Sequence, residues 1–266
     1  MAASPDSALD EFRGRYVVLK VGGTADVERG RIGADVGGLI AAGARVVIAH
    51  GGGDALSDYL ADRGETPHWI DGLRVTSAAT RDAAVTVFRG MVAPALIGEL
   101  VANGVSAVGI AGNDGGVIRV EQQSPELGFV GRVREVRRGL LDDLTARGHV
   151  PTIAPLGLGP DGELYNVNGD EIAGAVARAV HADALLFLTD VPAVLDADRQ
   201  PIRDLPAGRA ADLIAEGVIR DGMVPKVRAA MELLDAVSAV WITDGRRPHA
   251  IRQTLVEGAV GTRIVA

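Results

Sequence analysis

Two lysines are the residues whose type most clearly predicts chemistry in this 266-residue chain. The sequence has 27 basic residues, and only Lys20 and Lys226 are lysines. Either lysine occurs at these two positions by chance, or they are positions at which arginine cannot replace it. A compact, mobile ammonium contacts several phosphate oxygens in a way that a planar guanidinium does not imitate. We therefore expect both lysines to act on a phosphoryl group.

The surroundings of each lysine suit that role. Lys20 lies near the end of an apolar run, 16–21, that is too short for a helix and leads into Gly22 and Gly23. An ammonium placed there would reach a phosphate held by the glycine turn. Lys226 lies where a helix begins, and a cation in a first turn opposes the helix dipole. Its position makes better sense if an anion binds at that helix.

Asp170 is the acidic residue that could organise the two lysines. An aspartate between them would hold both ammonium groups without occupying the side on which they meet phosphate. The alternative is local, because acidic residues are favoured in the first turn of a helix. Asn168 and Glu171 also fit a capping pair at the same helix start.

Three glycine-rich turns follow the first three expected strands. They are Gly22-Gly23, Gly51-Gly52-Gly53 and the segment 112–116. Ligands of open α/β sheets bind at the carboxyl ends of the strands, where helix N-termini offer free N–H groups. Glycine allows the backbone to approach an anion closely, so these turns predict an anionic ligand.

The elements that must position these residues alternate between short apolar strands and helices. Such an order indicates a parallel sheet covered on both faces. A helix is expected over 77–103, interrupted by Pro94, and helices are also expected over 224–237 and 247–257. Short hairpins are expected over 117–135. No linker or repeat divides the chain, so two lobes of one continuous α/β unit are favoured.

Composition and motifs exclude several classes of protein. With no cysteine, disulfides, thiolate metal sites and cysteine nucleophiles are impossible, and the five histidines show no metal-ligand spacing. The net charge of −8 argues against nucleic-acid binding. Short apolar runs and the lack of a signal peptide favour a cytoplasmic protein without a membrane span. The P-loop, the protein-kinase signatures and the dinucleotide-binding glycine pattern are absent.

Six motifs occur in one order along the chain. They are Lys20-Val21-Gly22-Gly23, His50-Gly51-Gly52-Gly53, Gly72-Leu73-Arg74-Val75-Thr76, Gly128-Phe129-Val130-Gly131, Asn166-Val167-Asn168-Gly169-Asp170 and Gly222-Met223-Val224-Pro225-Lys226-Val227. Over roughly residues 16–266 this order resembles the acetylglutamate kinases of the amino acid kinase family. Among the departures from the family's pattern, Gly169 replaces the usual alanine and Pro94 falls within a helix.

The resemblance implies a three-layer α/β/α sandwich of the carbamate kinase-like type, with a mainly parallel central sheet. It implies an N-lobe, about 15–160, that binds the acyl amino acid and dimerises, and a C-lobe, about 161–266, that binds ATP. The implied reaction transfers a phosphoryl group from ATP, with Mg²⁺ carried by ATP, to the side-chain carboxylate of N-acetyl-L-glutamate. That is the second step of arginine biosynthesis. Because a carboxylate is already ionised at neutral pH, no general base is needed.

The resemblance also assigns roles to individual residues. Lys20 and Lys226 would stabilise the transferred phosphoryl group, and Asp170 would organise them. The implied substrate-binding residues are Gly51, Gly52, Arg74 and Asn166. The implied phosphate- and ATP-binding residues are Gly22, Gly23, Thr189, Asp190 and Met223.

Other functions stay open at this point. Related kinases act on glutamate or aminoadipate attached to an acidic amino-group carrier protein, and the arginines at 132, 134, 137 and 138 either form a patch for such a partner or belong to an ordinary solvated surface. A non-catalytic nucleotide- or oxyanion-binding protein is disfavoured by the retention of both lysines. The spacing of the glycines excludes a dinucleotide-dependent oxidoreductase. The resemblance further implies a homodimer without strong arginine feedback, because family members inhibited by arginine carry a longer N-terminal helix than the short segment before the first strand here.

Overall fold

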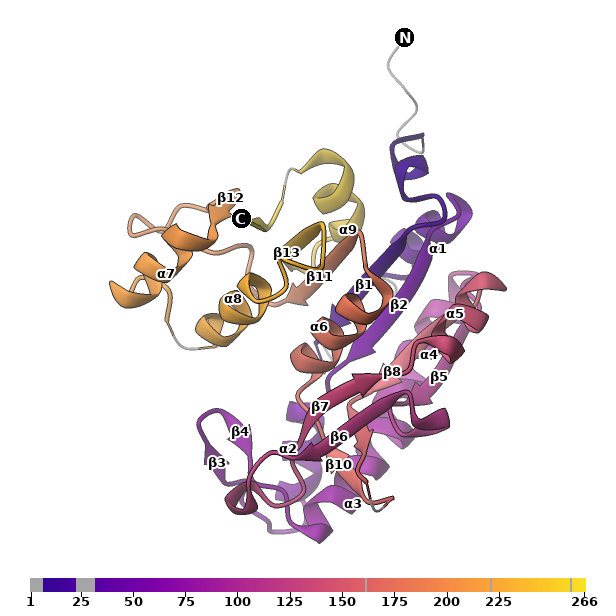
Figure 1. The fold of residues 1–266 in the computed structure, drawn as a ribbon, viewed down its shortest axis with the longest axis vertical. Coiled ribbons are helices and arrows are strands. Elements are labelled where there is room, and N and C mark those ends of the chain that lie inside the picture. The colour runs from indigo at the N-terminus through magenta and orange to yellow at the C-terminus, as the bar shows by residue number, and fades with distance from the viewer. Residues whose placement is uncertain (1–6, 23–31, 161, 221, 259) are drawn as a thin grey trace.

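Eight strands form the central sheet of the computed structural model, which describes residues 7–22, 32–160, 162–220, 222–258 and 260–266 (Figure 1). In sheet order they are β12 (Asp204–Pro206), β14 (Thr262–Val265), β13 (Ala239–Asp244), β11 (Ala184–Thr189), β1 (Tyr16–Val21), β2 (Arg45–His50), β8 (Val150–Ala154) and β5 (Ala107–Ala111). Neighbouring strands run parallel except β13 and β14, which are antiparallel. The expected mainly parallel sheet is confirmed.

Strand β1 shows why the sheet is covered on both faces. Successive side chains of a strand point to opposite faces. Val17 and Leu19 pack into the hydrophobic cluster on one face, and Val18 packs into the cluster on the other. This alternation places Lys20 on the same face as Val18.

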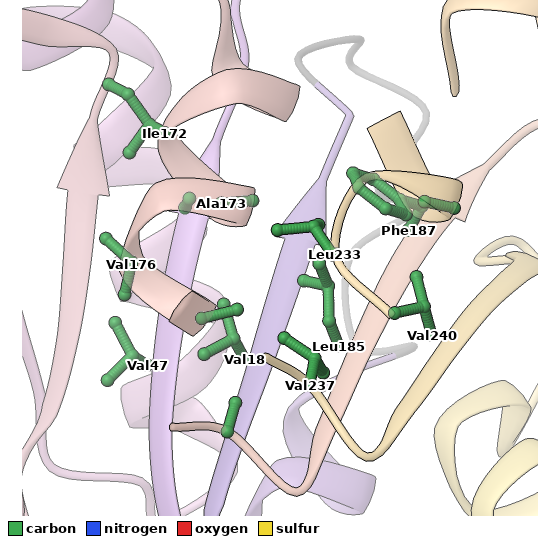
Figure 2. Close-up of a cluster of buried hydrophobic side chains, with 14 of the residues drawn as sticks. Val18, Val47, Ile172, Ala173, Val176, Leu185, Phe187, Leu233, Val237 and Val240 are labelled. Atoms are coloured by element: carbon green, nitrogen blue, oxygen red, sulfur yellow. The ribbon is translucent and has the colours of Figure 1, made fainter. Parts of the chain in front are cut away.

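Helices form the outer two layers. One face is covered by α1 (Gly33–Ala41) and α4 (Ala93–Ala102), the other by α5 (Gly139–Ala146), α6 (Gly169–Val180), α7 (Ala207–Ala215) and α8 (Met223–Met231). Figure 2 shows Ile172, Ala173 and Val176 of α6 packed over Val18 and Val47 of the sheet. The three-layer α/β/α architecture is therefore confirmed, and the side of the sheet that carries Lys20 is the side of α6 and α8.

A second, four-stranded sheet stands beside the central one. Its order is β10 (Leu164–Asn166), β9 (Leu156–Leu158), β6 (Ile118–Gln122) and β7 (Gly131–Val136). Strands β6 and β7 form the expected hairpin, whereas β9 and β10 were not anticipated. A separate small hairpin pairs β3 (Trp69–Ile70) with β4 (Leu73–Arg74).

The expected interruption at Pro94 is wrong. The chain stays helical through α3 (Ala78–Val87), a π-helical segment, η2 (Phe88–Val92), and α4. Proline has no N–H to donate to the carbonyl four residues earlier. The wider π turn just before Pro94 accommodates the missing hydrogen bond. Within this turn, Ala93 N–H donates to the carbonyl of Phe88, five residues earlier.

The joined helix 78–102 is long and apolar enough to cross a membrane by length and composition alone. Its buried side chains nevertheless pack inside the protein, Val87 near α2 (Gly53–Ala61) and Leu96 and Leu100 near α1. Core helices pass the same test, so the length carries no evidence of a membrane span.

The C-terminal third departs from the expected pattern at several points. Helix α8 ends at Met231 rather than near 237, and the helix expected over 247–257 is a short α9 (Ala250–Arg252) followed by a π-helical segment, η5 (Gln253–Glu257). Strands β12 and β14 were not anticipated. Three further short helical segments complete the described chain: η1 (Ser7–Phe12), η3 (Asp114–Gly116) and η4 (Pro125–Leu127).

Candidate active site

The candidate site lies where the carboxyl end of β1 meets the N-termini of α6 and α8. Strand β1 is central, with β2 on one side and β11 on the other. Lys20 is its penultimate residue, and the strand's alternation directs the side chain toward the α6 layer. Parallel sheets place their ligand sites at this end of the strands.

Asp170 joins the two lysines, which are 206 positions apart in the sequence. Lys20 Nζ lies 2.9 Å from Asp170 Oδ1, and Lys226 Nζ lies 3.0 Å from Asp170 Oδ2. All three side chains are largely enclosed, with exposures of 13%, 16% and 23% for Lys20, Asp170 and Lys226. Each oxygen of one carboxylate thus holds one ammonium.

The first turn of α6 fixes that carboxylate. Asn168 is the N-cap, and its side chain accepts a hydrogen bond from Asp170 N–H at 2.8 Å. The second half of the expected capping pair is wrong. Glu171 does not turn back to the cap but accepts from Val133 N–H of β7 at 2.6 Å.

The charge state of Asp170 follows from two opposing effects. Burial alone raises the pKa of a carboxyl group, and Lys20 and Lys226 lower it by direct attraction and hydrogen bonding. The two ammonium groups prevail, and the pKa of Asp170 lies below its ordinary value. The carboxylate is therefore ionised across the neutral range, and the three groups together carry one net positive charge.

A cavity of about 250 Å³ opens beside this trio. Its lining brings together seven residues predicted from the sequence: Lys20, Gly51, Gly52, Arg74, Asn166, Asp170 and Lys226. The lining also contains side chains that sequence reasoning missed, among them Trp69, Phe88 and Val130. Trp69 stands just before the Gly-Leu-Arg-Val-Thr motif, and that proximity could have pointed to it.

Arg74 is held rigidly at the wall of the cavity. It is 5% exposed, and its Nη2 donates to the carbonyl of Gly53 at 2.9 Å and to Ser57 Oγ at 2.6 Å. The guanidinium lies 4.5 Å from the centre of the Trp69 ring, its cross-strand partner. Burial lowers the pKa of Arg74, opposed by the charge of Asp54. Nη1 is buried without a hydrogen-bond partner among the described residues, which is costly for a cation unless an anion binds there.

The glycine turn after β2 brings backbone to the cavity. Gly52 caps α2, and its carbonyl accepts from Leu56 N–H. A Cβ at Gly52 would stand 2.5 Å from the Phe88 ring, so only glycine fits without displacing that buried side chain. The start of a nine-residue helix thus faces the same space as Arg74 and the lysines.

Asn166 connects the cavity to the second sheet. Its backbone N–H donates to the carbonyl of Phe129, and its side-chain Nδ2 donates to Thr76 Oγ1 at 3.3 Å. A bridge between Val130 and Asn166 runs alongside. The amide is therefore pinned on one side and borders the cavity on the other.

The remaining predicted residues lie outside the cavity lining. Thr189 ends β11, beside β1, and its Oγ1 lies 3.1 Å from Asp190 Oδ1. Gly22 approaches the carbonyl of Leu188 on the same strand. Met223 begins α8 and packs against the main hydrophobic cluster, one turn before Lys226. Gly23 lies outside the described residues.

Three of the four arginines at 132, 134, 137 and 138 form local ion pairs. Arg134 pairs with Glu121, and Arg137 Nε lies 3.4 Å from Glu135. Arg138 pairs with Asp142 through both Nε and Nη2 and also donates to the carbonyl of Ala179. These partners favour the interpretation of an ordinary solvated surface over that of a patch built for an acidic partner.

Comparison with known proteins gives consistent results. The family model described as "Amino acid kinase family" matches residues 15–244. The acetylglutamate kinase of Rubrobacter xylanophilus is 44% identical, covering 94% of this chain and 97% of its own length. The acetylglutamate kinase of Granulibacter bethesdensis is 38% identical, covering 96% and 92%.

Solved structures show the same fold. The smu.665 protein of Streptococcus mutans superposes with a TM-score of 0.84 at 27% identity, covering 94% of this chain and 98% of that one. Carbamate kinase of Giardia superposes with a TM-score of 0.67 at 18% identity, covering 94% and 98%.

Proposed function

This chain belongs to the amino acid kinase family, and from that premise we propose that it uses ATP to phosphorylate the side-chain carboxylate of N-acetyl-L-glutamate. The product is an acyl phosphate, and the reaction is the second step of arginine biosynthesis. The observation that carries the proposal is the trio of Lys20, Asp170 and Lys226 at the wall of a cavity whose other wall holds a buried, half-satisfied arginine.

The chemistry needs little from the protein beyond alignment and charge. The attacking carboxylate of the substrate is ionised at neutral pH, so no residue has to remove a proton. As the phosphoryl group moves, negative charge spreads over its equatorial oxygens. Lys20 and Lys226 stabilise that charge from two directions, and Asp170 keeps their ammonium groups apart and oriented.

The substrate is recognised on the opposite wall. The Nη1 edge of Arg74 pairs with the carboxylate of the acyl amino acid that does not react. The N–H of Gly52 receives the reacting carboxylate, Gly51 borders it with its own N–H donated to the carbonyl of Val21, and Asn166 orients the acylated amine. We assign the part of this chemistry that Gly51, Gly52 and Arg74 carry to an N-lobe of about 15–160.

The nucleotide occupies the adjoining edge of the sheet, in a C-lobe of about 161–266. Thr189 and Asp190 lie beside it, Gly22 approaches its phosphates, and Met223 supports the helix that carries Lys226. ATP would carry Mg²⁺, which would lower the charge of the phosphates. Both oxygens of Asp170 are already engaged by lysines, which fits a metal held by ATP rather than by this carboxylate.

We also propose a cytoplasmic homodimer. Strand β5 is an edge of the central sheet, and the neighbouring helical run exposes Met91 and Val101. An open edge strand beside apolar side chains is a typical site of self-association. Light scattering coupled to gel filtration tests this, and a mass of one chain at micromolar concentration would refute it.

Phosphoryl transfer to free N-acetyl-L-glutamate is the decisive experiment. Hydroxylamine traps the acyl phosphate as a hydroxamate, and we expect a saturable signal that needs ATP and the acyl amino acid together. The Lys20→Met variant is the control and should give none. If the wild-type protein binds ATP but yields no hydroxamate, free N-acetyl-L-glutamate is not its substrate.

A further inference from the structure

Glu171 makes a contact that neither helix capping nor the reaction explains. It lies in the first turn of α6, where a glutamate ordinarily bonds the N-cap N–H. Instead its Oε1 accepts from the backbone N–H of Val133, 38 positions earlier in the sequence, at 2.6 Å. The side chain thus leaves its own helix to hold another element.

The element that it holds is an edge strand. Strand β7 is the outermost of the four-stranded sheet, so the backbone groups on its free side have no neighbouring strand in the part of the chain that the structure describes. Its pairing with β6 is also irregular, because Arg119 faces Glu135 while Val120 faces Val133. A strand with one free side and a bulge needs support from outside its sheet, and Glu171 supplies a hydrogen bond there.

The position of β7 matters because the strand begins at the cavity wall. Val130 lines the cavity, and β7 starts at the next residue, Gly131. A Cβ at Gly131 would stand 2.9 Å from the Tyr165 side chain, so the strand is closely seated at this end. A shift of β7 relative to α6 would therefore move Val130 and change the width of the acyl-substrate cavity.

The same helical turn carries the lysine bridge. Asp170 and Glu171 are consecutive, and Asn168 caps the turn that holds both. A groove of about 460 Å³ runs between β7, α6 and α8. Side chains do not fill that space, which increases the importance of the polar contact between β7 and α6.

The surroundings of Glu171 suit a hydrogen-bond acceptor at the edge of this groove. Burial raises the pKa of Glu171, while the Val133 N–H and the charge of Arg132 act in the opposite direction. Arg134 and Glu135 of β7 and Glu232, the C-cap of α8, also line the groove.

We propose that Glu171 is a positioning residue for the phosphoryl transfer. By holding the N–H of Val133, it sets the distance between the Val130 wall of the acyl-substrate cavity and the Asp170 bridge between the lysines. The inference rests on the proposed function for its kinetic consequence, but the contact itself can be tested without turnover.

Two conservative variants separate the reach of the side chain from its charge. Glu171→Asp keeps the charge and suits a first helical turn, but it withdraws the acceptor by one methylene. Glu171→Gln keeps the reach and loses the charge. Glu135→Asp, on an exposed residue of β7 that lines the same groove, is the matched control.

We expect Glu171→Asp to raise KM for N-acetyl-L-glutamate about fivefold, the effect of one lost hydrogen bond, with KM for ATP unchanged. Amide hydrogen exchange at Val133 should accelerate in the same variant. Glu171→Gln should match the wild-type protein in both measurements, because an amide oxygen still accepts the bond. Glu135→Asp should also match it, because this change leaves Glu171 in place.

Three results would overturn the proposal. They are an unchanged KM in Glu171→Asp, an equal rise in KM for both substrates, and a Glu171→Gln variant as impaired as Glu171→Asp. Failure of the proposed function is distinguishable, because the wild-type protein would then form no hydroxamate. In that case exchange at Val133 decides alone, and equal rates in wild type and Glu171→Asp refute the role of Glu171.

Discussion

Arg74 on one wall of the cavity and the two lysines on the other are held in place in different ways. On the acyl side, Arg74 is fixed by neighbours close in sequence, namely Trp69 on the facing strand and Gly53 and Ser57 on α2. On the phosphoryl side, Lys20 and Lys226 come from a strand and a helix far apart in the chain and meet only through Asp170. The arginine is held by a local structure, whereas the pair of lysines forms only in the complete fold.

This difference reflects what each wall must do. A group that recognises a substrate carboxylate serves best when its direction is fixed before binding. Groups that follow charge as it moves from donor to acceptor must approach from more than one side. We therefore expect substitutions on the acyl wall to act mainly on KM and those on the phosphoryl wall mainly on kcat.

Lys20→Arg is the change with the largest expected effect. The guanidinium keeps the charge but cannot follow the phosphoryl group as a compact ammonium does. We expect kcat to fall about a thousandfold, in line with the loss of a charge-stabilising group in phosphoryl transfer. Calorimetry should show that ATP still binds. Turnover near the wild-type rate would remove Lys20 from its assigned role.

Arg74→Lys tests the acyl wall. The lysine keeps the charge but loses the planar fork that bonds α2 and the substrate carboxylate together. We expect KM for N-acetyl-L-glutamate to rise about a hundredfold, equal to about 2.7 kcal/mol, with a smaller change in kcat. Steady-state kinetics with each substrate varied in turn makes the measurement. A fall in kcat with no change in KM would contradict the proposed difference between the two walls.

Asp170→Asn removes the negative charge between the two lysines. Its effect on the free energy of unfolding tests whether that charge stabilises the fold. The folded-state pKa of Asp170 is lowered, so its stabilising contribution is present above the ordinary carboxyl value of about 4 and is lost as pH falls below it. We expect the variant to be less stable by about 2 kcal/mol between pH 5 and 8, the magnitude of hydrogen bonds to charged groups. Urea unfolding across this range and at pH 3 provides the comparison. A difference that persists unchanged at pH 3 would contradict the assignment.

Gly169→Ala has the smallest expected effect. A Cβ at this position would lie 3.2 Å from the carbonyl oxygen of His50 and 3.6 Å from Gly51 Cα. The contact is tight but requires only a small shift, and alanine favours the helix over glycine. We expect kcat/KM to change by less than about threefold, because these two small effects oppose each other. A loss of more than tenfold would show that the turn after β2 tolerates no movement.

The fold could be predicted from the sequence wherever a strand is a continuous apolar run. Strand β1 has this form, and it spans the predicted run, 16–21. Strands β9, β10 and β12 have three residues each, too few to establish a period, and their pairing depends on distant partners. At Pro94 the local rule predicts a break, but a π turn satisfies the backbone without one.

The candidate site, like the fold, has features that could be predicted from the sequence and features that could not. Lys20, Lys226 and Asp170 were predicted from residue type and position, and the fold does bring them together. Their arrangement around the Asp170 carboxylate was also expected, but the distances could not be predicted, because they depend on how α8 packs against α6. Glu171 shows the limit most clearly, since its local context predicts a cap and only the position of β7 explains its actual partner.

The sharing of one carboxylate by the chain's two lysines has a practical consequence for covalent chemistry. Every side-chain amine of this protein lies in the candidate site, because all other basic side chains are arginines or histidines. Amine-directed cross-linkers, dyes and acylating agents that modify a lysine here necessarily modify the candidate site. Occupancy of the site by nucleotide should therefore be readable from the mass of a single labelled protein, without an activity assay.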